Sequence, residues 1–280
     1  MSAPESPRSQ EPEPKSRPKS RPKSRKAKLL GFGVAVMSGI ALSSVFRSDP
    51  AVIDDVLGAA SGQDATCRIP DDFASPRVER PRPEQVRRTV VTRYILALSW
   101  SPGFCAAHGR EADNAMQCSG EAGPFGFILH GLWPETDGRD WPQYCAPTRA
   151  IARETLRAHL CMTPSPQLLQ HEWARHGSCM AATPEAYFDT AQRAFDRVHR
   201  PDMAALTRNG QLRAGDVRRA FVAANPGMPM NAVMVSAGQG GWLDEVRLCL
   251  DRRFAYRACP AGERGATDGA RVRIFSTGVR

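Results

Sequence analysis

Eight cysteines are the feature of this 280-residue sequence that most restricts what the chain folds into. An even number of cysteines in a chain that leaves the cytoplasm is typical of a disulfide framework. Structural zinc sites place cysteines in short C-x-x-C pairs, and no two cysteines of this sequence stand that close. We therefore expect a disulfide-stapled fold that uses Cys67, Cys105, Cys118, Cys145, Cys161, Cys179, Cys249 and Cys259.

The N-terminal part of the chain carries the pattern of an exported protein. Residues 1–28 are rich in Pro and Ser and hold nine Lys and Arg against three Glu, so we expect a disordered basic tail. Residues 29–46 contain no charge, which predicts a signal h-region or a membrane anchor. Residues 47–88 are predicted as a linker, and residues 89–280 as the folded domain, periplasmic or secreted.

Positive charge is concentrated in the tail. All five lysines lie within residues 1–28, where the net charge is +6, and the rest of the chain carries only +3. A protein that coats nucleic acid over its whole surface is therefore not indicated. Nothing in the sequence implies a stable protein partner, so we expect a monomer, attached to a membrane only if residues 29–46 are retained as an anchor.

Apolar periodicity from Thr89 onward predicts strands on both sides of a central helical block. The expected strands cover residues 94–100, 125–129, 232–235, 243–250 and 272–275. The expected helices cover residues 149–160, 165–180, 183–198 and 216–224, and Ser165-Pro166 and Thr183-Pro184 are start signals. This arrangement predicts the α+β class, with an antiparallel β-sheet flanked by helices.

Two segments concentrate polar and ionisable residues. The sequence HGLWPE begins at His130, at the end of an expected strand, and HEWARHGSC begins at His171, on an expected helix. Arg175 lies three residues and His176 four residues after Glu172, so the three side chains share one helical face. Such a cluster is costly in a core and uncommon on a solvated face, so we expect these residues to line a cleft.

Two other enzyme classes use similar residues. A zinc protease needs two histidines one helical turn apart, but His171 and His176 are five apart and rotated by about 140° on a helix. We therefore expect no metal site here. A histidine phosphatase uses an R-H-G core, which Arg175-His176-Gly177 matches, but its pattern has a further Arg where Ser178 stands.

Together the two segments resemble the active-site segments of the ribonuclease T2 family, in the right order and 41 residues apart. The stretches LALSWSP from Leu96 and EVRLCLD from Glu245 also resemble that family. The similarity covers about residues 90–260 and implies the family's α+β fold. It implies an exported, metal-independent endoribonuclease without a cofactor, which cleaves single-stranded RNA to 2′,3′-cyclic phosphates and then 3′-phosphates.

The resemblance also implies roles for the catalytic segment residues. His176 is the expected general base and His130 the expected general acid, and the sequence does not exclude the reverse order. His171 is expected to bind phosphate, while Glu172 and Arg175 steady the transition state. The family usually has Lys at position 175, and Arg keeps the charge.

The family pattern further implies a base-binding wall and a disulfide pairing. Trp133 is expected to stack on a base, and Trp141 and Glu135 to complete the pocket. The resemblance pairs Cys145 with Cys179, Cys105 with Cys118 and Cys249 with Cys259, which leaves Cys67 for Cys161. Two alternatives remain: a histidine phosphatase, and a secreted protein of the same fold that binds RNA without cleaving it.

Overall fold

The computed structural model describes residues 67–208, 211–263 and 265–275, which form part of one unit. The predicted tail at 1–28 and the apolar segment at 29–46 lie outside the described residues. Among the residues that are described, no helix has the length and apolar content needed to cross a bilayer.

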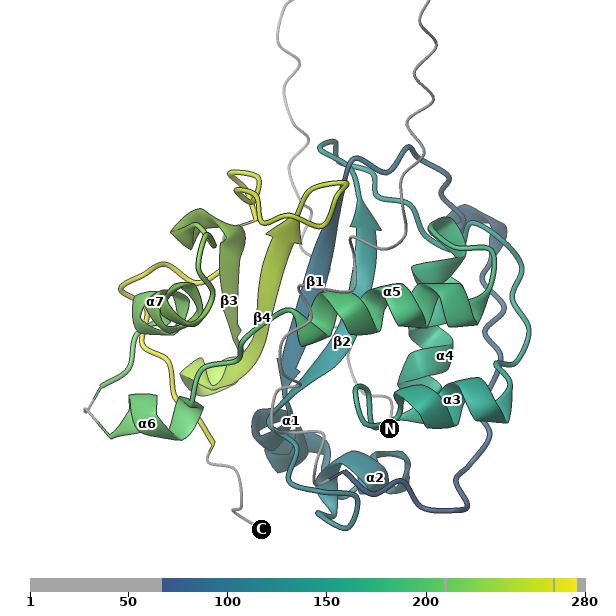
Figure 1. Cartoon of the computed structure of the whole chain (residues 1–280), viewed down its shortest axis with the longest axis horizontal. Helices are drawn as coiled ribbons and strands as arrows, with labels where there is room; N and C mark the ends of the chain where they lie inside the picture. The colour runs from purple at the N-terminus through teal and green to yellow at the C-terminus, as the bar shows by residue number, and fades with distance from the viewer. Residues whose placement is uncertain (1–66, 209–210, 264, 276–280) are drawn as a thin grey trace, which may run out of the picture. The chain divides into compact units, whose positions relative to one another are not determined.

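A four-stranded antiparallel sheet organises the described domain (Figure 1). Its strands are β1 (Arg93–Trp100), β2 (Phe127–Glu135), β3 (Val233–Ala237) and β4 (Leu243–Leu250), in the order β2-β1-β4-β3. Side chains alternate across β1, so Leu96 and Leu98 join the main core while Ile95 belongs to a small cluster on the opposite face. This second face carries the polar residues discussed below.

Seven α-helices surround the sheet in the described residues (Figure 1). They are α1 (Ser101–His108), α2 (Ala115–Cys118), α3 (Arg153–His159), α4 (Pro166–Arg175), α5 (Pro184–Asp196), α6 (Met203–Thr207) and α7 (Ala214–Ala224). Helix α5 contacts β1 and β2, α4 contacts β2, and α7 contacts β3. Short 3-10 helices cover Pro83–Gln85, Ala112–Asn114, Gly177–Cys179, Met230–Ala232 and Gln239–Gly241.

The predicted helix starts have a visible cause. The Ser165 hydroxyl accepts the Leu168 N–H at the start of α4, and the Thr183 hydroxyl accepts the Ala186 N–H at the start of α5. Each cap is followed by a proline in the first helical turn, where the missing N–H costs nothing. The α+β class with an antiparallel sheet, predicted from the sequence, is confirmed.

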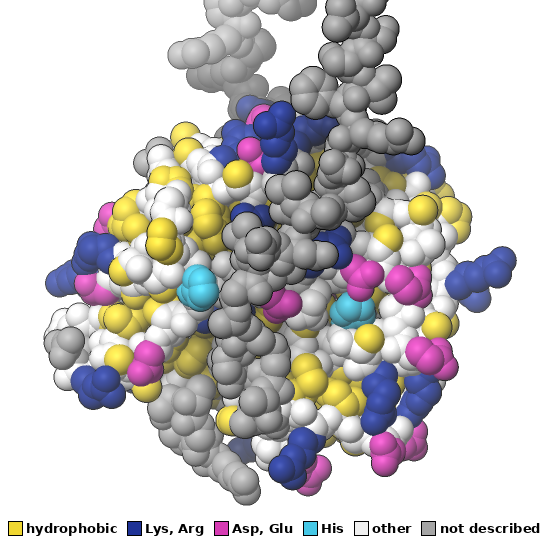
Figure 2. Space-filling model, in the orientation of Figure 1, with side chains coloured by type: hydrophobic (Ala, Val, Ile, Leu, Met, Phe, Trp, Pro, Cys, Tyr) yellow, Lys and Arg dark blue, Asp and Glu magenta, His cyan; other side chains and the backbone are white. Residues whose placement is uncertain are grey.

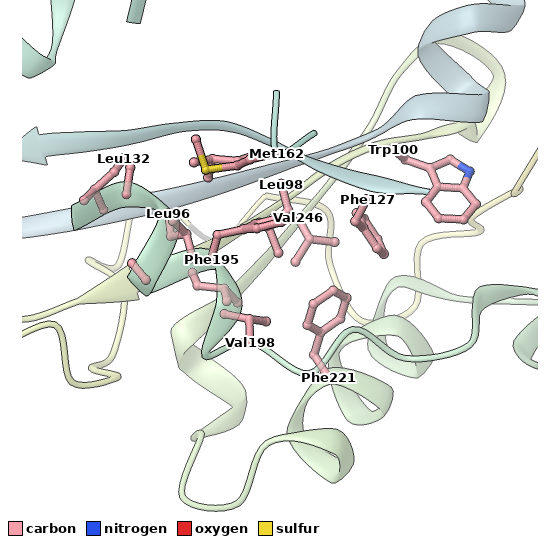
Figure 3. Packing of buried hydrophobic residues seen from close by; sticks show 14 of the residues in the cluster. Leu96, Leu98, Trp100, Phe127, Leu132, Met162, Phe195, Val198, Phe221 and Val246 are labelled. Carbon is pink, nitrogen blue, oxygen red and sulfur yellow. The ribbon is translucent and has the colours of Figure 1, made fainter. Parts of the chain in front are cut away.

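The main core fills the space between the sheet and helices α5 and α7 (Figure 3). Phe221 of α7 meets Phe127 of β2 edge to face, with ring centroids 5.4 Å apart. Each such buried side chain contributes about 1.5–3 kcal/mol relative to leaving it exposed. The side chains labelled in Figure 3 come from three strands, from α5 and α7, and, for Met162 and Val198, from the chain between helices: Leu96, Leu98, Trp100, Phe127, Leu132, Met162, Phe195, Val198, Phe221 and Val246.

Several predicted boundaries were wrong. Strand β2 continues through Glu135 rather than ending at residue 129, and α4 ends at Arg175 rather than near residue 180. Within residues 272–275 an isolated bridge between Arg273 and Trp242 replaces the expected strand. Strand β1 ends at Trp100, and Pro102 lies in the first turn of α1, a position that tolerates proline.

Residues 67–88, which we call the N-terminal strap, differ from the expected linker. Cys67 is bonded to Cys161, and the Phe73 ring is buried beneath the Arg153 guanidinium at 4.0 Å. The strap also pairs with the domain through a backbone bridge between Arg87 and Gln143. A sequence rich in Pro and Arg thus lies against the domain, because one disulfide and a buried aromatic ring hold it there.

The four expected disulfides are all present. They join Cys67 to Cys161, Cys105 to Cys118, Cys145 to Cys179 and Cys249 to Cys259. On the face shown in Figure 2, basic and acidic side chains are mixed, and no large area carries one sign. This mixture agrees with the small net charge outside the tail.

Candidate active site

One cleft brings together all eight candidate site residues. It has a volume of about 610 Å³ and lies on the polar face of the sheet, between β2, β4 and helix α4. Its walls include Ile95, Met234 and Arg247. The candidate residues that line it are His130, Trp133, Glu135, Trp141, His171, Glu172, Arg175 and His176.

A β-bulge sets the position of His130. Ala97 of β1 pairs with Gly131, and Leu98 pairs with Leu129, so His130 is the extra residue of β2. Strict alternation would place residues three apart on opposite faces, and the extra residue allows Leu129 and Leu132 both to enter the core while His130 and Trp133 both reach the cleft.

Two carboxylates face the imidazole of His130. Its Nδ1 lies 2.6 Å from Oε2 of Glu245, and its Nε2 lies 3.6 Å from Oε1 of Glu172. Burial lowers the pKa of His130, but the hydrogen bond to Glu245 and the negative charges of Glu172 and Glu245 outweigh burial and raise it. His130 is therefore biased toward its protonated form.

The Glu172 carboxylate lies where β2 and α4 approach most closely. It is 2 % exposed, and its Oε2 accepts the indole N–H of Trp133 at 2.7 Å. Burial raises the pKa of Glu172, while His130 and His171 oppose that effect. A Cβ atom at Gly131 would collide with this carboxylate, so glycine is required for the approach.

His176 follows the last turn of α4 and is in the opposite state to His130. It is 7 % exposed, and its Nδ1 is buried without a hydrogen-bond partner among the described residues. Burial, followed by the positive charges of Arg175, His171 and His130, holds the pKa of His176 well below its usual value. The imidazole is therefore neutral at physiological pH.

The Trp133 indole lies between the two catalytic candidates. His176 stacks on it with ring centroids 5.4 Å apart and an interplanar angle of 28°. His130 meets the same indole edge to face, with centroids 5.1 Å apart. Both imidazoles are thus positioned by one rigid aromatic side chain, itself fixed by its bond to Glu172.

The other two basic residues of the helical segment, Arg175 and His171, differ in their partners. Arg175 lines the cleft, and its side chain forms no hydrogen bond or ion pair with the described residues. His171 is held by the strap, because its Nδ1 lies 2.5 Å from Oε1 of Glu79. The hydroxyl of Tyr144 donates to the other oxygen of Glu79 at 3.0 Å.

Glu135 and Trp141 line the end of the cleft near a buried arginine. Arg93 is 1 % exposed and binds Glu135 at 3.4 Å and Glu263 at 2.8 Å. Burial raises the pKa of Glu135 to about 7, and Glu263 reinforces the effect while Arg93 opposes it. The Arg87 guanidinium covers the Trp141 ring at 4.1 Å.

Sequence reasoning assigned no role to Glu245, Arg247, Glu79 or Arg93. A signal existed for Glu245 and Arg247, because alternate residues of a strand share a face. Both lie in β4, where Glu245 pairs with Ser99 and Arg247 with Ala97 of β1. No comparable signal marked Glu79, because it lies in a segment without periodicity.

The arrangement is suited to proton transfer at an anionic group. The cleft holds one imidazole with a lowered pKa, one with a raised pKa, and a guanidinium that has no partner among the described residues, so it is suited to supply a base, an acid and a positive charge. Within the described ranges, no three His, Cys, Asp or Glu side chains are placed to share a metal ion.

Several bacterial ribonucleases have similar sequences. A probable ribonuclease of Haemophilus influenzae is 34% identical over 129 residues, which are 42% of this chain and 47% of the relative. Ribonuclease I of Escherichia coli is 29% identical over 138 residues, 36% of this chain and 52% of the relative. The chain thus spans about half the length of these curated relatives.

The fold and a family model give the broader relationship. The structure of an RNase-related protein from Calystegia sepium aligns with a TM-score of 0.50 and 19% identity, covering 66% of this chain and 97% of that one. At this identity the likeness establishes the fold alone. The model of the ribonuclease T2 family matches residues 91–259, more than half of the sequence, and this chain therefore belongs to the ribonuclease T2 family.

Proposed function

We propose that this protein is an endoribonuclease that cleaves single-stranded RNA by attack of the substrate's own 2′-hydroxyl. The observation that carries the proposal is the pair of imidazoles that pack on one indole, with the pKa of His176 lowered and the pKa of His130 raised. Transesterification needs one group that accepts a proton and one that donates a proton at the same pH, and two imidazoles in different environments meet this need.

In the first step His176 removes the proton of the 2′-hydroxyl, and the resulting oxygen attacks the adjacent phosphorus. The bond between phosphorus and the 5′-oxygen breaks, and His130 donates its proton to that oxygen. The products are a 2′,3′-cyclic phosphate and a free 5′-hydroxyl. The sequence alone leaves the roles of base and acid open, and the directions of the two pKa shifts support this order.

In the second step water replaces the leaving alcohol. His130, now neutral, removes a proton from the water, and the water oxygen attacks the phosphorus of the cyclic phosphate. The bond between phosphorus and the 2′-oxygen breaks, and His176 returns its proton to that oxygen. The product is a 3′-phosphate, and both imidazoles are back in their starting states. Apart from the RNA substrate, the cycle therefore consumes only water.

Negative charge develops on the phosphoryl oxygens during both steps. Arg175 supplies an unpaired guanidinium in the cleft, which binds phosphate through two parallel hydrogen bonds. His171 adds a second donor, held by Glu79. Glu172 acts through its neighbours, because it fixes the Trp133 indole and faces His130. Together these groups steady the transition state.

The base next to the cleaved bond is expected to stack on an aromatic wall. Trp133 and Trp141 both line the cleft, and stacking on an aromatic side chain contributes about 1–3 kcal/mol per base. Glu135 lies beside them and accepts an exocyclic amine when it is ionised. Contacts of this kind are compatible with broad base specificity.

We place this activity outside the cytoplasm, in the periplasm or the medium. Four disulfides persist in an oxidising compartment, and the uncharged segment 29–46 is typical of export. Sequencing the N-terminus of the mature protein distinguishes a cleaved signal from a retained anchor. Analytical ultracentrifugation of the soluble domain tests the expected monomer.

One assay separates this function from its two alternatives. Purified protein is incubated in excess EDTA with yeast RNA and, separately, with p-nitrophenyl phosphate. We expect the RNA to be shortened and the phosphate ester to remain intact. Phosphate release without shortening would identify a histidine phosphatase, and binding of intact RNA would identify a non-catalytic RNA-binding protein. Either result would overturn the proposal.

A further inference from the structure

A second hollow adjoins the candidate active site on the far side of His171. It has a volume of about 840 Å³ and lies between the strap, from Val78 to Arg88, and the loop that runs from Tyr144 to Ala150. We call it the strap groove. The family match begins at residue 91, so the strap wall lies outside the matched region.

The strap groove and the cleft share a partition. Glu79 lines the groove and bonds His171 of the cleft at 2.5 Å. Tyr144 also lines the groove, donates its hydroxyl to Glu79, and uses its backbone N–H to bond the carbonyl of Arg175 at 2.8 Å. One layer of side chains therefore separates the groove from the phosphate-binding end of the cleft.

The charges of the strap groove favour an anionic ligand. Three arginines line it, and the side chains of Arg80 and Arg149 form no hydrogen bond or ion pair with the described residues. Arg88 bonds only the carbonyl of Cys145, at 2.8 Å. Glu79 is the one acidic residue among the residues that line the groove, and both of its oxygens are already engaged by His171 and Tyr144.

The remaining walls are apolar and fixed. Val78 is 38% exposed, and prolines at positions 81, 83 and 147 line the same hollow. The disulfide between Cys145 and Cys179 ties the loop to the residues after α4. Tyr144 has a φ of 52°, an uncommon value for a non-glycine residue that its two hydrogen bonds maintain. A preformed cationic hollow with flat apolar walls is suited to single-stranded nucleic acid.

We propose that the strap groove is a second RNA-binding site, which receives nucleotides of the same strand beyond those at the cleaved bond. Arg80 and Arg149 bind backbone phosphates there, and bases lie against the proline and valine walls. The basic tail of this chain does not complement an arginine-lined groove, since residues 1–28 carry a net charge of +6. The proposal rests on the proposed function only in assigning both sites to one strand.

The test measures binding of uncleavable RNA by the full chain. Fluorescein-labelled 2′-O-methyl RNA of about three and about ten nucleotides is titrated by anisotropy at several salt concentrations. We expect the double variant Arg80→Gln, Arg149→Gln to bind the longer strand about threefold to tenfold more weakly than the unmodified protein. A plot of its log binding constant against log salt concentration should have a slope shallower by about 1.4, since each phosphate contact on a single strand contributes about 0.7.

A matched control removes the same two charges elsewhere. Arg110 and Arg208 are exposed and lie outside the strap groove, so the paired control Arg110→Gln, Arg208→Gln should leave the affinity for the longer strand unchanged. Equal losses in the control and the double variant, or equal losses on both strand lengths, would overturn the groove. If binding depends on the two arginines but unmodified RNA stays intact, the groove stands and the ribonuclease activity fails. If RNA is cleaved but binding does not depend on these two arginines, the ribonuclease activity stands and the groove proposal fails.

Discussion

His130 and His176 are chemically identical side chains whose surroundings shift their pKa in opposite directions. Burial and the positive charges of Arg175, His171 and His130 hold the pKa of His176 below its usual value, whereas two carboxylates raise that of His130 against the effect of burial. Such a divergence at one site is how a protein obtains both a base and an acid near neutral pH. The proposed roles of base and acid therefore rest on the surroundings of the two imidazoles rather than on residue type.

Removal of either imidazole should nearly abolish catalysis. His130→Ala and His176→Ala should each lower kcat/KM on RNA by at least ~10²-fold, the lower end of acid–base contributions. His108 lies 51% exposed beside Glu111, outside the cleft, so His108→Ala should retain normal activity. A stopped assay with a fluorogenic RNA substrate measures all three. Cleavage near the normal rate by either cleft variant would refute the assignment.

The carboxylate partner of His130 should set one limb of the pH profile. Activity needs His176 unprotonated and His130 protonated, so the rate rises through the low pKa of His176 and falls through the raised pKa of His130. Glu245→Gln removes a negative charge from His130, so the falling limb of kcat/KM should move to lower pH. An unchanged falling limb, or a shift of the rising limb alone, would contradict this assignment.

The sequence singled out His130, Glu172 and His176 as candidates, and the structure brings them into one cleft, but the sequence did not reveal the residues that bind them. Short-range spacing on a helix reveals which side chains share a face, and this placed Glu172 and His176 together. Glu245 and Glu79 are 115 and 92 residues away from the histidines that they bind, so only the folded chain brings them together.

The bulge in β2 and the adjacent glycine explain how a strand and a helix form one site. The sequence predicted a strand that ends before His130, because a local pattern does not reveal an extra residue in a ladder. In the structure the strand continues, and Gly131 allows α4 to bring Glu172 against the sheet. The capped helix starts were predictable, by contrast, because a hydroxyl cap acts within three residues.

A side chain at position 131 should separate these two elements. Gly131→Ala places a Cβ atom against the Glu172 carboxylate, which must move and release the Trp133 indole. We expect a loss of about 1–3 kcal/mol in unfolding free energy and a clear loss of activity. Gly269 has open space around its Cβ position, so Gly269→Ala is the matched control. Urea unfolding measures both, and equal stabilities would contradict the proposed close approach.

The described domain is held together by four disulfides that differ in what they connect. Cys67–Cys161 ties the strap to the domain, whereas Cys145–Cys179 ties the loop at the strap groove to the residues after His176. The resemblance to a known family predicted Cys145–Cys179, and Cys67–Cys161 followed from it only by elimination. The position of the strap was not predictable, because a segment rich in Pro and Arg resembles a linker when its buried contacts are unknown.

Removal of these two disulfides should have different consequences. Replacing either pair by serine should lower unfolding free energy by about 2–5 kcal/mol. At a temperature where both variants remain folded, Cys145→Ser with Cys179→Ser should also lower activity, since it loosens the chain that follows His176. The double variant Cys67→Ser, Cys161→Ser should keep more of its activity on RNA. Calorimetry and RNA cleavage measure the two effects, and equal activities in the two variants would contradict the distinction.

The most direct test of the proposed chemistry uses one ribose in a DNA strand. If the nucleophile is the substrate's 2′-hydroxyl, the protein in excess EDTA should cut only on the 3′ side of that ribose. Mass spectrometry should find a 2′,3′-cyclic phosphate on the new end. Replacing the 2′-hydroxyl by 2′-O-methyl should abolish the cut, although the strand still fits the cleft. Scission of the methylated strand at a comparable rate would contradict transesterification by His176 and His130.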